Sequence, residues 1–550
     1  MLSALFALLA VAGLAIVAHR TGAKEMRPGR VTRALESRWI LAAIFVATFV
    51  LLWFAWGAVQ PIPVVHDEMS YVLEAQILAR GHWGLPSPPL PVFWEQPHVL
   101  VDPVLTSKYF PGHPLMLSIG ALVGWVPLMP LVLNALSAVL LFVLARRVAS
   151  GAVAVLAWNI WLFSPMVLYF GPSYYSEATT TLCWLAGWYA LLEWRRTRAP
   201  HWLVAVAVCT GWDAITRPLT GVAYAIPIAA IVLRDAIKMR IGRQLVMGML
   251  AGSIVIAILP VWSKATTGQW STTPLALYTK LYMPYDTPGF GLNATPPARE
   301  VTPDLRELNK TYASSHVGHT PAALPRTLLE RAWYLSVSIW GTSSGVLMTF
   351  ALIGLFALPA EAAFAVATGI VLLLTYLLFA TPASWTLYYY ESAPAYAFLS
   401  AVGLALGASM IGRPRGVASN SEYSWRSTRW SRAILTAAVI LLMPALGWTR
   451  VVRVLHINDR RFLVGFANLV ESIHDEKAVV FVRYGPLHNP HRTFVRNLAD
   501  PKGARIWVVY DRGDRENAGL LALAPGRTSY LFDEAAQHLY VYDPRAAAPR

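Results

Sequence analysis

Long apolar stretches divide this sequence, and they constrain its fold more than any other feature. A helix needs about 20 apolar residues to cross the hydrocarbon core of a bilayer, with a range of about 17 to 25. Stretches of about 15 to 20 residues lie at 2–18, 39–58, 130–146, 151–169, 177–194, 202–216, 218–233, 244–263, 344–358, 362–380, 393–411 and 432–449. Because lipid cannot satisfy backbone polar groups, such spans are helical. The pattern predicts an α-helical polytopic membrane protein with about twelve transmembrane helices.

The composition supports this class and argues against others. Of the 550 residues, 56% are hydrophobic and 14% are charged, whereas a soluble protein has about 25% charged residues. The formal net charge of +15 does not indicate a nucleic-acid partner, because the basic residues lie in short connections between apolar stretches. Cys183 and Cys209 lie inside such stretches, which argues against a disulfide framework or a cysteine zinc site.

The distribution of Lys and Arg predicts the orientation. If the N-terminus is outside and all twelve stretches cross, the basic connections fall inside and hold nearly half of the 45 Lys and Arg. These connections are 20–38, 146–147, 195–198, 234–243 and 413–432. The run Leu115 to Pro130 would invert this pattern if it crossed, so we expect an interfacial or re-entrant helix there. The run 2–18 has no basic start and no small-residue cleavage site, so we expect a retained span.

Four polar connections lie outside in this orientation, at 59–114, 171–176, 264–343 and 381–392. We call 59–114 the first outer loop and 264–343 the second outer loop. A long polar loop between two spans is costly unless it has a role, and loops on rigid scaffolds often carry chemistry. We therefore expect a transmembrane domain, 1–450, whose catalytic part is the first outer loop.

Residues 451–550 differ in kind from the rest. Charge rises, and short strand patterns appear at 478–482, 506–510, 528–532 and 538–542, with helix patterns at 460–473 and 516–523. Strands that alternate with helices predict a small C-terminal α/β domain, which the orientation places outside. No Gly-rich loop follows its first strand, so nucleotide binding is not predicted.

The first outer loop carries a candidate helix with acidic residues at its start. Its apolar residues recur at helical spacing, at Met69, Val72, Leu73 and Ile77, with Ser70, Glu74 and Arg80 opposite and Gly81 as a stop. We expect this amphipathic helix to lie at the membrane interface, with Asp67 at its N-terminus. A helix N-terminus favours a carboxylate, which suits a base that must be ionised near neutral pH. The alternative is that Asp67 is an ordinary helix cap.

Other polar residues near the spans leave two interpretations open. His66, Asp67 and Glu68 are consecutive and cannot easily face one metal ion, so a metal site there is disfavoured. Arg217 lies between two apolar stretches, which marks either a functional site or an arginine that reaches the headgroups, and Asp213 is expected to pair with it.

Further candidates are aromatic or basic residues at the outer face. Lys108 is either an interfacial anchor or a phosphate partner, and His113 is a candidate that could simply cap the next helix. Tyr388, Tyr389, Tyr390 and Glu391 form either an aromatic belt or part of a site, as do Tyr174, Tyr175 and Glu177. The second outer loop offers Lys264, Lys280, Tyr282 and Asp286, without a pattern that ranks them.

Two motifs carry a family resemblance. Asp67-Glu68-Met69-Ser70-Tyr71 and Ser107-Lys108-Tyr109-Phe110-Pro111-Gly112 resemble the membrane glycosyltransferases of the C superfamily (GT-C), in particular the protein O-mannosyltransferase and aminoarabinose transferase group. The resemblance covers the membrane part throughout, and the tail looks like the outer domain of bacterial members. It implies a sugar donor carried on a polyprenyl phosphate, with Asp67 as the acceptor's general base and Lys108 at the lipid phosphate.

The sequence departs from the aminoarabinose group near Lys108. Ser107 stands where that group has a Glu, and Phe110-Pro111 replaces paired prolines. The resemblance therefore implies the role of Asp67 more strongly than that of Lys108.

Together these features predict a glycosyltransferase in a bacterial plasma membrane, with its active site outside. It would move a sugar from a polyprenyl phosphate to a lipid, glycan or protein acceptor by an inverting displacement, with no divalent metal required. The predicted site comprises catalytic Asp67 and Glu68; donor phosphate-binding Lys108, Arg217, Tyr388 and Tyr389; and substrate-binding His66, His113, Tyr174, Tyr175 and Lys280. The alternatives are a glycolipid transporter or flippase and a non-catalytic protein that binds glycolipid.

Overall fold

The computed structural model describes residues 34–57, 62–239, 241–292, 295–341, 344–356, 358–411 and 462–544. The predicted spans 2–18 and 432–449 lie outside these residues, as does the connection 412–431. Within the described residues, four helical segments are long and apolar enough to cross a bilayer: Trp39–Trp56, Leu128–Val148, Pro218–Met239 and Gly242–Thr267. These helices support an integral membrane protein, while the count of about twelve spans stays a prediction.

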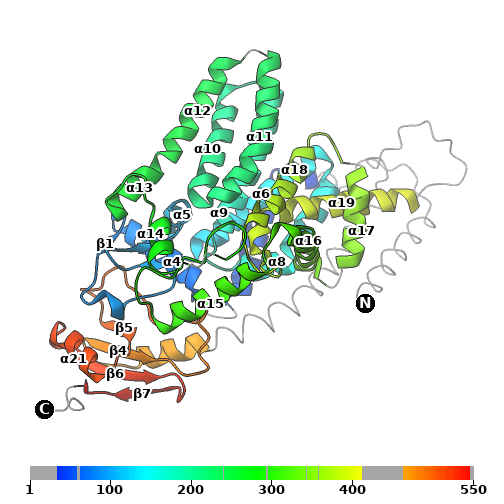
Figure 1. Cartoon of the computed structure of the whole chain (residues 1–550). Coiled ribbons are helices and arrows are strands. Elements are labelled where there is room, and N and C mark those ends of the chain that lie inside the picture. The colour runs from blue at the N-terminus through cyan, green and yellow to red at the C-terminus, as the bar shows by residue number, and fades with distance from the viewer. Residues whose placement is uncertain are drawn as a thin grey trace, which may run out of the picture.

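Most of the apolar stretches are helices with bounds near those expected. They are α3 (Trp39–Gly57), α6 (Leu128–Val148), α9 (Glu177–Thr197), α10 (Pro200–Thr216), α11 (Pro218–Met239), α12 (Gly242–Ile256), α13 (Ile258–Thr267), α17 (Ser344–Phe356), α18 (Ala363–Thr375) and α19 (Ala393–Ile411). The helices α10, α11 and α12 stand together at one end of the molecule (Figure 1).

The expectation of one continuous span at 151–169 is wrong. The stretch forms α7 (Gly151–Leu162) and the short α8 (Pro165–Phe170). The break occurs because the Ser164 hydroxyl accepts a hydrogen bond from the backbone N–H of Val167 and so caps α8, and Pro165 then occupies its first turn. Hydropathy alone does not register such a cap.

The basic ends of three helices meet in one place. Arg147 at the end of α6 pairs with Glu193 of α9 at 2.5 Å, and Arg195 of α9 pairs with Asp235 of α11 at 2.9 Å. Three of the predicted inner connections therefore lie at the same end of the group formed by α6, α9 and α11. The 21 residues of α9 span roughly 30 Å, which separates this end from Glu177 by about the thickness of a bilayer core.

The first outer loop folds into compact structure. It contains α4 (His66–Ala79), β1 (Leu85–Pro86), η1 (Pro91–Phe93), β2 (Val99–Leu100) and β3 (Val104–Ser107), and α5 (Gly112–Leu122) follows. The expected run Leu115 to Pro130 is thus the rest of α5, a turn and the start of α6. With 11 residues, α5 is too short to cross a bilayer.

The helix α4 begins and ends as expected, and protein covers both its apolar and its polar side. Its apolar Met69, Leu73 and Ile77 pack into the cores on the two faces of the C-terminal sheet. Its polar side is also covered, because β3 lies on it: Ser107 contacts the Ser70 hydroxyl at 2.6 Å, and its backbone N–H donates to Glu74 at 2.9 Å. The amphipathic pattern therefore reflects protein packing on both sides.

The C-terminal strands form where the sequence predicts them. They are β4 (Ala478–Arg483), β5 (Ile506–Tyr510), β6 (Thr528–Asp533) and β7 (His538–Val541), with helices at Phe462–Glu471 and α21 (Asp514–Ala522). The sheet order is β5-β4-β6-β7; β5 and β6 run parallel to β4, and β7 is antiparallel to β6. This sheet lies at the opposite end of the molecule from the tips of α10 to α12 (Figure 1).

The sheet and the first outer loop share one hydrophobic core. Trp94 packs edge-on against Trp507 with ring centres 5.0 Å apart, and Phe93 contacts Phe481. The Asn497 side chain donates to the Trp94 carbonyl at 2.8 Å, and its backbone N–H donates to Gln96. The sheet is therefore built onto the first outer loop.

The second outer loop adds α14 (Pro274–Leu281), α15 (Pro303–Val317), η2 (Pro321–Ala323) and α16 (Leu324–Trp340). From α16, the buried Arg331 donates to the carbonyls of Tyr376, Phe379 and Thr381. It thereby holds the segment η4 (Tyr376–Leu378) that leads to η5 (Thr386–Ser392). A buried cation at a helix C-terminus satisfies carbonyls that would otherwise lack donors.

Candidate active site

The start of α4 separates the roles of two neighbouring carboxylates. The N-cap position is Val65, and Glu68 accepts hydrogen bonds from the backbone N–H groups of Val64 and Val65 at 2.9 and 3.3 Å. Glu68 also accepts from the N–H of Tyr174 at 3.0 Å, and it is buried. The capping function therefore belongs to Glu68, and the interpretation of Asp67 as an ordinary cap is wrong.

Asp67 is held by side chains and remains accessible. Its Oδ1 accepts a hydrogen bond of 2.5 Å from the Tyr109 hydroxyl, and its Oδ2 lies 2.7 Å from His66 Nδ1. The side chain is 29% exposed, against 4% for His66. Burial alone would raise the pKa of Asp67, but the imidazoles of His66 and His98 and the Tyr109 hydrogen bond hold it well below its ordinary value. Asp67 is thus an ionised carboxylate that a substrate can reach.

Two further histidines, His491 and His98, lie near His66 and Asp67. His66 Nε2 lies 3.1 Å from Nδ1 of His491, which belongs to the segment after β4. His98 lies on the other side, with its Nε2 3.8 Å from Asp67 Oδ2. Burial and the charge of Lys108 lower the pKa of His98, so its imidazole is neutral near pH 7. The C-terminal part of the chain therefore contributes directly to the surroundings of Asp67.

His66, Asp67 and His98 also form a group that could hold a divalent ion. Each offers one ligand atom, and the three atoms lie within 4.8 Å of one another. Two imidazoles and a carboxylate suit zinc or a similar ion. The sequence disfavours a metal site formed by His66, Asp67 and Glu68, and Glu68 indeed turns to the backbone. His98 supplies the third possible ligand atom instead.

Arg217 lies at the end of α10 among acidic and phenolic groups. It forms an ion pair with Glu177 at the start of α9, and Glu391 of η5 lies 3.8 Å away. It also donates to the Tyr376 hydroxyl at 2.9 Å, and its side chain is 13% exposed. The expected pairing with Asp213 is wrong, because Arg217 meets Asp213 only through the backbone, N–H to carbonyl.

Two stacked tyrosines connect Asp67 with Arg217. The Tyr109 ring, whose hydroxyl binds Asp67, stacks on Tyr71 with ring centres 4.6 Å apart. Tyr71 donates to the Ser176 hydroxyl at 3.2 Å, and Arg217 donates to the same hydroxyl at 3.3 Å. The structure thus brings together the first outer loop and the junction of α10 and α11, which are 150 residues apart in sequence (67 to 217).

The two predicted tyrosines of η5 face different partners. The Arg217 guanidinium lies 5.6 Å from the centre of the Tyr388 ring. Burial and the negative charges of Asp286 and Asp67 hold the pKa of Tyr388 well above its ordinary value, which places Tyr388 within electrostatic range of both carboxylates. Tyr389 instead accepts from Arg331 at 3.1 Å and is buried. Tyr388 is therefore part of the group around Asp67 and Arg217, whereas Tyr389 supports the fold.

Lys108 is buried and already paired. Its Nζ lies 2.7 Å from Asp286 of the second outer loop and is in contact range of the Tyr109 and Tyr278 rings. Its side chain is only 3% exposed. Lys108 is thus not an interfacial anchor, and it joins the two outer loops beneath Asp67.

The remaining predicted substrate-binding residues differ in their surroundings. His113 uses both nitrogens, one with the Thr179 hydroxyl at 2.8 Å and one with the Tyr174 carbonyl at 2.9 Å. Burial lowers the pKa of His113 to about 4, so it is a neutral link between α5 and α9. The half-buried Tyr175 is within electrostatic range of Asp67 and Glu68. Lys280 is exposed on α14.

Position 112 of the second motif requires a glycine for a steric reason. A Cβ placed there would lie 2.2 Å from the Thr216 hydroxyl and 2.9 Å from the Ile215 carbonyl. Only glycine lets the start of α5 approach the end of α10 this closely. The last residue of α10, Thr216, directly precedes Arg217. The motif that contains Lys108 therefore also positions Arg217.

Sequence reasoning did not identify several residues of this group as site residues. Tyr109 and Tyr71 stand inside the quoted motifs, so their position was visible although their roles were not. His98 has a positive φ of 66° in the first outer loop, and His491 is 425 residues from its partner His66. Tyr376 lies within a predicted span. No local pattern marks these three residues.

This chain resembles known proteins in its structure. No family model matches the chain, and no curated protein matches it. The chain is similar to the solved structure of ArnT from Cupriavidus metallidurans in the apo state, with a TM-score of 0.48 and 13% identity over 89% of this chain and 92% of that one. It is also similar to the Archaeoglobus fulgidus oligosaccharyltransferase AglB, at a TM-score of 0.44 and 12% identity over 91% and 70%. The arabinosyltransferase EmbB from Mycobacterium smegmatis gives a TM-score of 0.43 and 14% identity over 84% and 43%.

Proposed function

We propose that this protein is a membrane glycosyltransferase that moves a sugar from a polyprenyl phosphate to an acceptor hydroxyl at the outer face. The observation that carries the proposal is the state of Asp67: an ionised carboxylate, held by Tyr109 and His66, that remains 29% exposed. The donor class follows from the resemblance of the two motifs to GT-C enzymes. Both motifs lie in this group of residues.

Asp67 would act as the general base. It accepts the proton of the acceptor hydroxyl while the acceptor oxygen attacks the anomeric carbon of the sugar. The bond from that carbon to the phosphate oxygen breaks, and its electron pair leaves with the lipid phosphate. One displacement inverts the anomeric carbon. A positioned base of this kind contributes about 10²- to 10⁴-fold in rate.

Arg217 is the better candidate for the phosphate, in preference to Lys108. Both cations already have an acidic partner, Glu177 for Arg217 and Asp286 for Lys108, so accessibility decides: the side chain of Arg217 is 13% exposed and that of Lys108 is 3% exposed. The Tyr376 hydroxyl and the Tyr388 ring lie beside Arg217 and could extend its contacts with phosphate oxygens. A guanidinium offers several donors in a fixed plane, which suits phosphate.

The proposed outer location is supported by the opposite ends of α9. Glu177, which pairs with Arg217, stands at its start, and the arginines of a predicted inner connection stand at its end. If the basic end is cytoplasmic, Asp67 and Arg217 face outside.

The test compares Asp67→Asn with Asp102→Asn, a change at an exposed aspartate of the same loop. Transfer from a labelled polyprenyl-phosphate sugar and binding of that donor are measured in the purified full chain. We expect Asp67→Asn to lose about 10²- to 10⁴-fold in transfer while donor binding persists, and Asp102→Asn to resemble the natural protein. Normal transfer by Asp67→Asn would remove Asp67 from the chemistry and favour the transporter alternative.

A further inference from the structure

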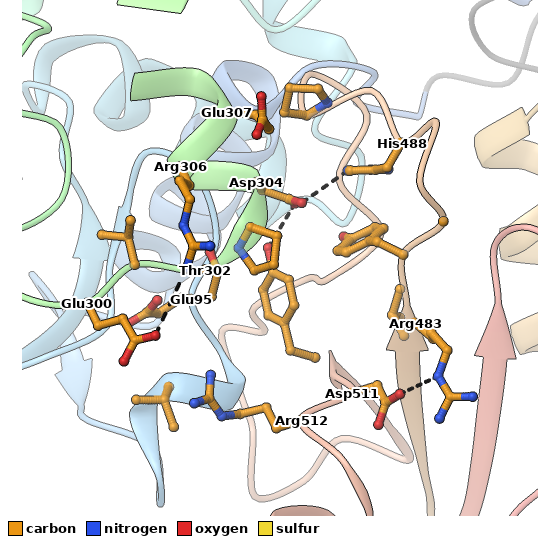
Figure 2. A pocket seen from close by; sticks show the side chains of 18 of the residues that line it. Glu95, Glu300, Thr302, Asp304, Arg306, Glu307, Arg483, His488, Asp511 and Arg512 are labelled. Carbon is orange, nitrogen blue, oxygen red and sulfur yellow. Dashed lines mark hydrogen bonds and ion pairs between the residues drawn. The ribbon is translucent and has the colours of Figure 1, made fainter. Parts of the chain in front are cut away.

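A cavity of about 910 Å³ lies between the C-terminal sheet and the two outer loops, away from Arg217. Its walls come from the carboxyl ends of β4 and β5, from the start of α15 and from the first outer loop near Glu95. Figure 2 shows Asp304 of α15 joined to His488 by an ion pair at the upper part of this wall, with Arg512 and Asp511 lower in the view. The volume is within the range of about 300 to 1,000 Å³ for ligand sites.

The sheet topology independently indicates a ligand site at the edge formed by the carboxyl ends of β4 and β5. From β4 the chain crosses to β5 on one side, and then returns to β6 on the other side of β4. Ligands of open α/β sheets bind at the carboxyl ends of parallel strands where the strand order reverses. Here α15 of the second outer loop covers that edge and completes the cavity.

The charges of the cavity wall compensate one another. Five acidic side chains line it, along with four arginines and His488. Glu95 pairs with Arg299 at 3.0 Å, and Asp511 pairs with Arg483 at 2.6 Å. His488 lies 3.1 Å from Asp304 and 2.8 Å from Glu534. Hydrogen bonds to these two acids outweigh burial and raise the pKa of His488 to about 9, so it is charged at neutral pH. The formal charges of the wall therefore balance apart from Glu95, whose pKa burial raises to about 7, so the wall has no large excess of either sign.

The same wall suits hydroxyl groups. Carboxylate oxygens accept hydrogen bonds and guanidinium groups donate them, and a sugar hydroxyl can do both. The Tyr510 ring is buried and the Tyr484 ring stacks on His488, so the apolar surface that a sugar ring could contact comes from the exposed Pro303 and Pro486. Polar groups of both kinds beside this small apolar surface favour a neutral polyhydroxylated ligand.

The cavity adjoins the proposed base through a short segment. His488 and Pro490 line it, and the next residue, His491, contacts His66 beside Asp67. Three residues extend at most about 11 Å. The backbone at His488 in the cavity wall thus lies within about 11 Å of that at His491, a separation that a chain of sugars can span.

We propose that this cavity binds the acceptor, and that the acceptor is a neutral, hydroxyl-rich glycan. The proposal rests on the proposed glycosyltransferase function. The cavity holds the glycan, and Asp67 receives the proton of the hydroxyl that the glycan presents.

The test uses a matched pair on α15. Glu307 lines the cavity and pairs with Lys310, which does not line it, and both are exposed. Glu307→Trp and Lys310→Trp break the same ion pair, but only Glu307→Trp places bulk in the cavity. Transfer to a delipidated cell-envelope glycan fraction is measured with the full chain over a range of fraction concentrations, together with hydrolysis of the donor by water.

We expect Glu307→Trp to raise the glycan concentration needed for half-maximal transfer at least 10-fold, with donor hydrolysis unchanged, and Lys310→Trp to have no effect. Equal behaviour of the two variants would overturn the cavity as acceptor site. A labelled product that binds an anion exchanger would overturn the neutral class. Asp67→Asn is expected to lose donor hydrolysis whether or not Glu307 is replaced. A failure of the proposed function would therefore appear in Asp67→Asn, whereas a failure of this inference would appear in the comparison of Glu307→Trp with Lys310→Trp.

Discussion

The Tyr109 hydroxyl donates a 2.5 Å hydrogen bond to Asp67, and the ring of the same tyrosine stacks on Tyr71, which contacts the serine that Arg217 also binds. One side chain of the Lys108 motif therefore touches the proposed base and leads to the proposed phosphate cation. The two motifs of the first outer loop are parts of one arrangement.

Replacing Tyr109 with Phe removes a donor to the carboxylate and keeps the stacking. A hydrogen bond to a charged group contributes roughly 1.5 to 3 kcal/mol, so the pKa of Asp67 rises by about one unit or more. The acidic limb of the transfer rate is expected to move to higher pH, so the variant should lose progressively more activity than the natural protein as the pH falls. A pH profile of transfer checks this, and an unmoved acidic limb would contradict it.

Added zinc is expected to inhibit transfer. His66, Asp67 and His98 offer ligand atoms within 4.8 Å of one another, and a bound ion would occupy the carboxylate that accepts the proton. Chelation should restore the rate. In His98→Ala the inhibition constant for zinc should rise at least 10-fold, since one ligand is lost. Zinc titrations of both proteins test this, and equal inhibition would exclude this group as the zinc site.

Gly112→Ala is expected to displace the end of α10. The new Cβ would lie 2.2 Å from the Thr216 hydroxyl, next to Arg217. Overpacking of this kind costs about 1 to 3 kcal/mol, and donor binding should weaken about 10-fold or more. Gly242→Ala is the control, because a Cβ there meets nothing within 4 Å. Donor binding and thermal midpoints of both variants are measured; unchanged binding in Gly112→Ala would show that the contact does not position Arg217.

Glu74 makes stability depend on pH. Burial raises its pKa to about 7 from the ordinary value of 4.5, so the folded state binds a proton that the unfolded state has released between these values. Stability from this group therefore falls as pH rises from 4.5 to 7 and is then constant. Glu74→Gln should raise the thermal midpoint relative to the natural protein at pH 8 and give no gain at pH 4. A gain of equal size at both values would contradict this account.

The sequence predicts those parts of the fold that depend on local pattern. Hydropathy locates α3 and α6, and alternation locates β4 and β5. The place of Asp67 at the start of α4 follows from apolar spacing, and the site motifs from their resemblance. The partner of Arg217 could not be predicted, because i and i+4 spacing suggested Asp213, whereas Glu177 is brought close by helix packing. His491 is likewise placed by tertiary structure alone.

The protein partners of α4 could not be predicted for a related reason. An amphipathic pattern states that one side is buried, but not by what. Met69, Leu73 and Ile77 of α4 belong to the cores that the C-terminal sheet also enters, and β3 hides Ser70 and Glu74 on the other side. A membrane surface and a distant domain impose the same spacing on a helix.

The core shared by Trp94 and Trp507 has a consequence for how the protein is made. A ribosome delivers the first outer loop early, and its hydrophobic partners emerge only after some 400 further residues (94 to 507). Until then the loop that carries Asp67 has no sheet to pack on, and His66 has no His491 beside it. An unfinished chain would therefore be inserted in the membrane without a formed site, and synthesis of the last strands would complete it.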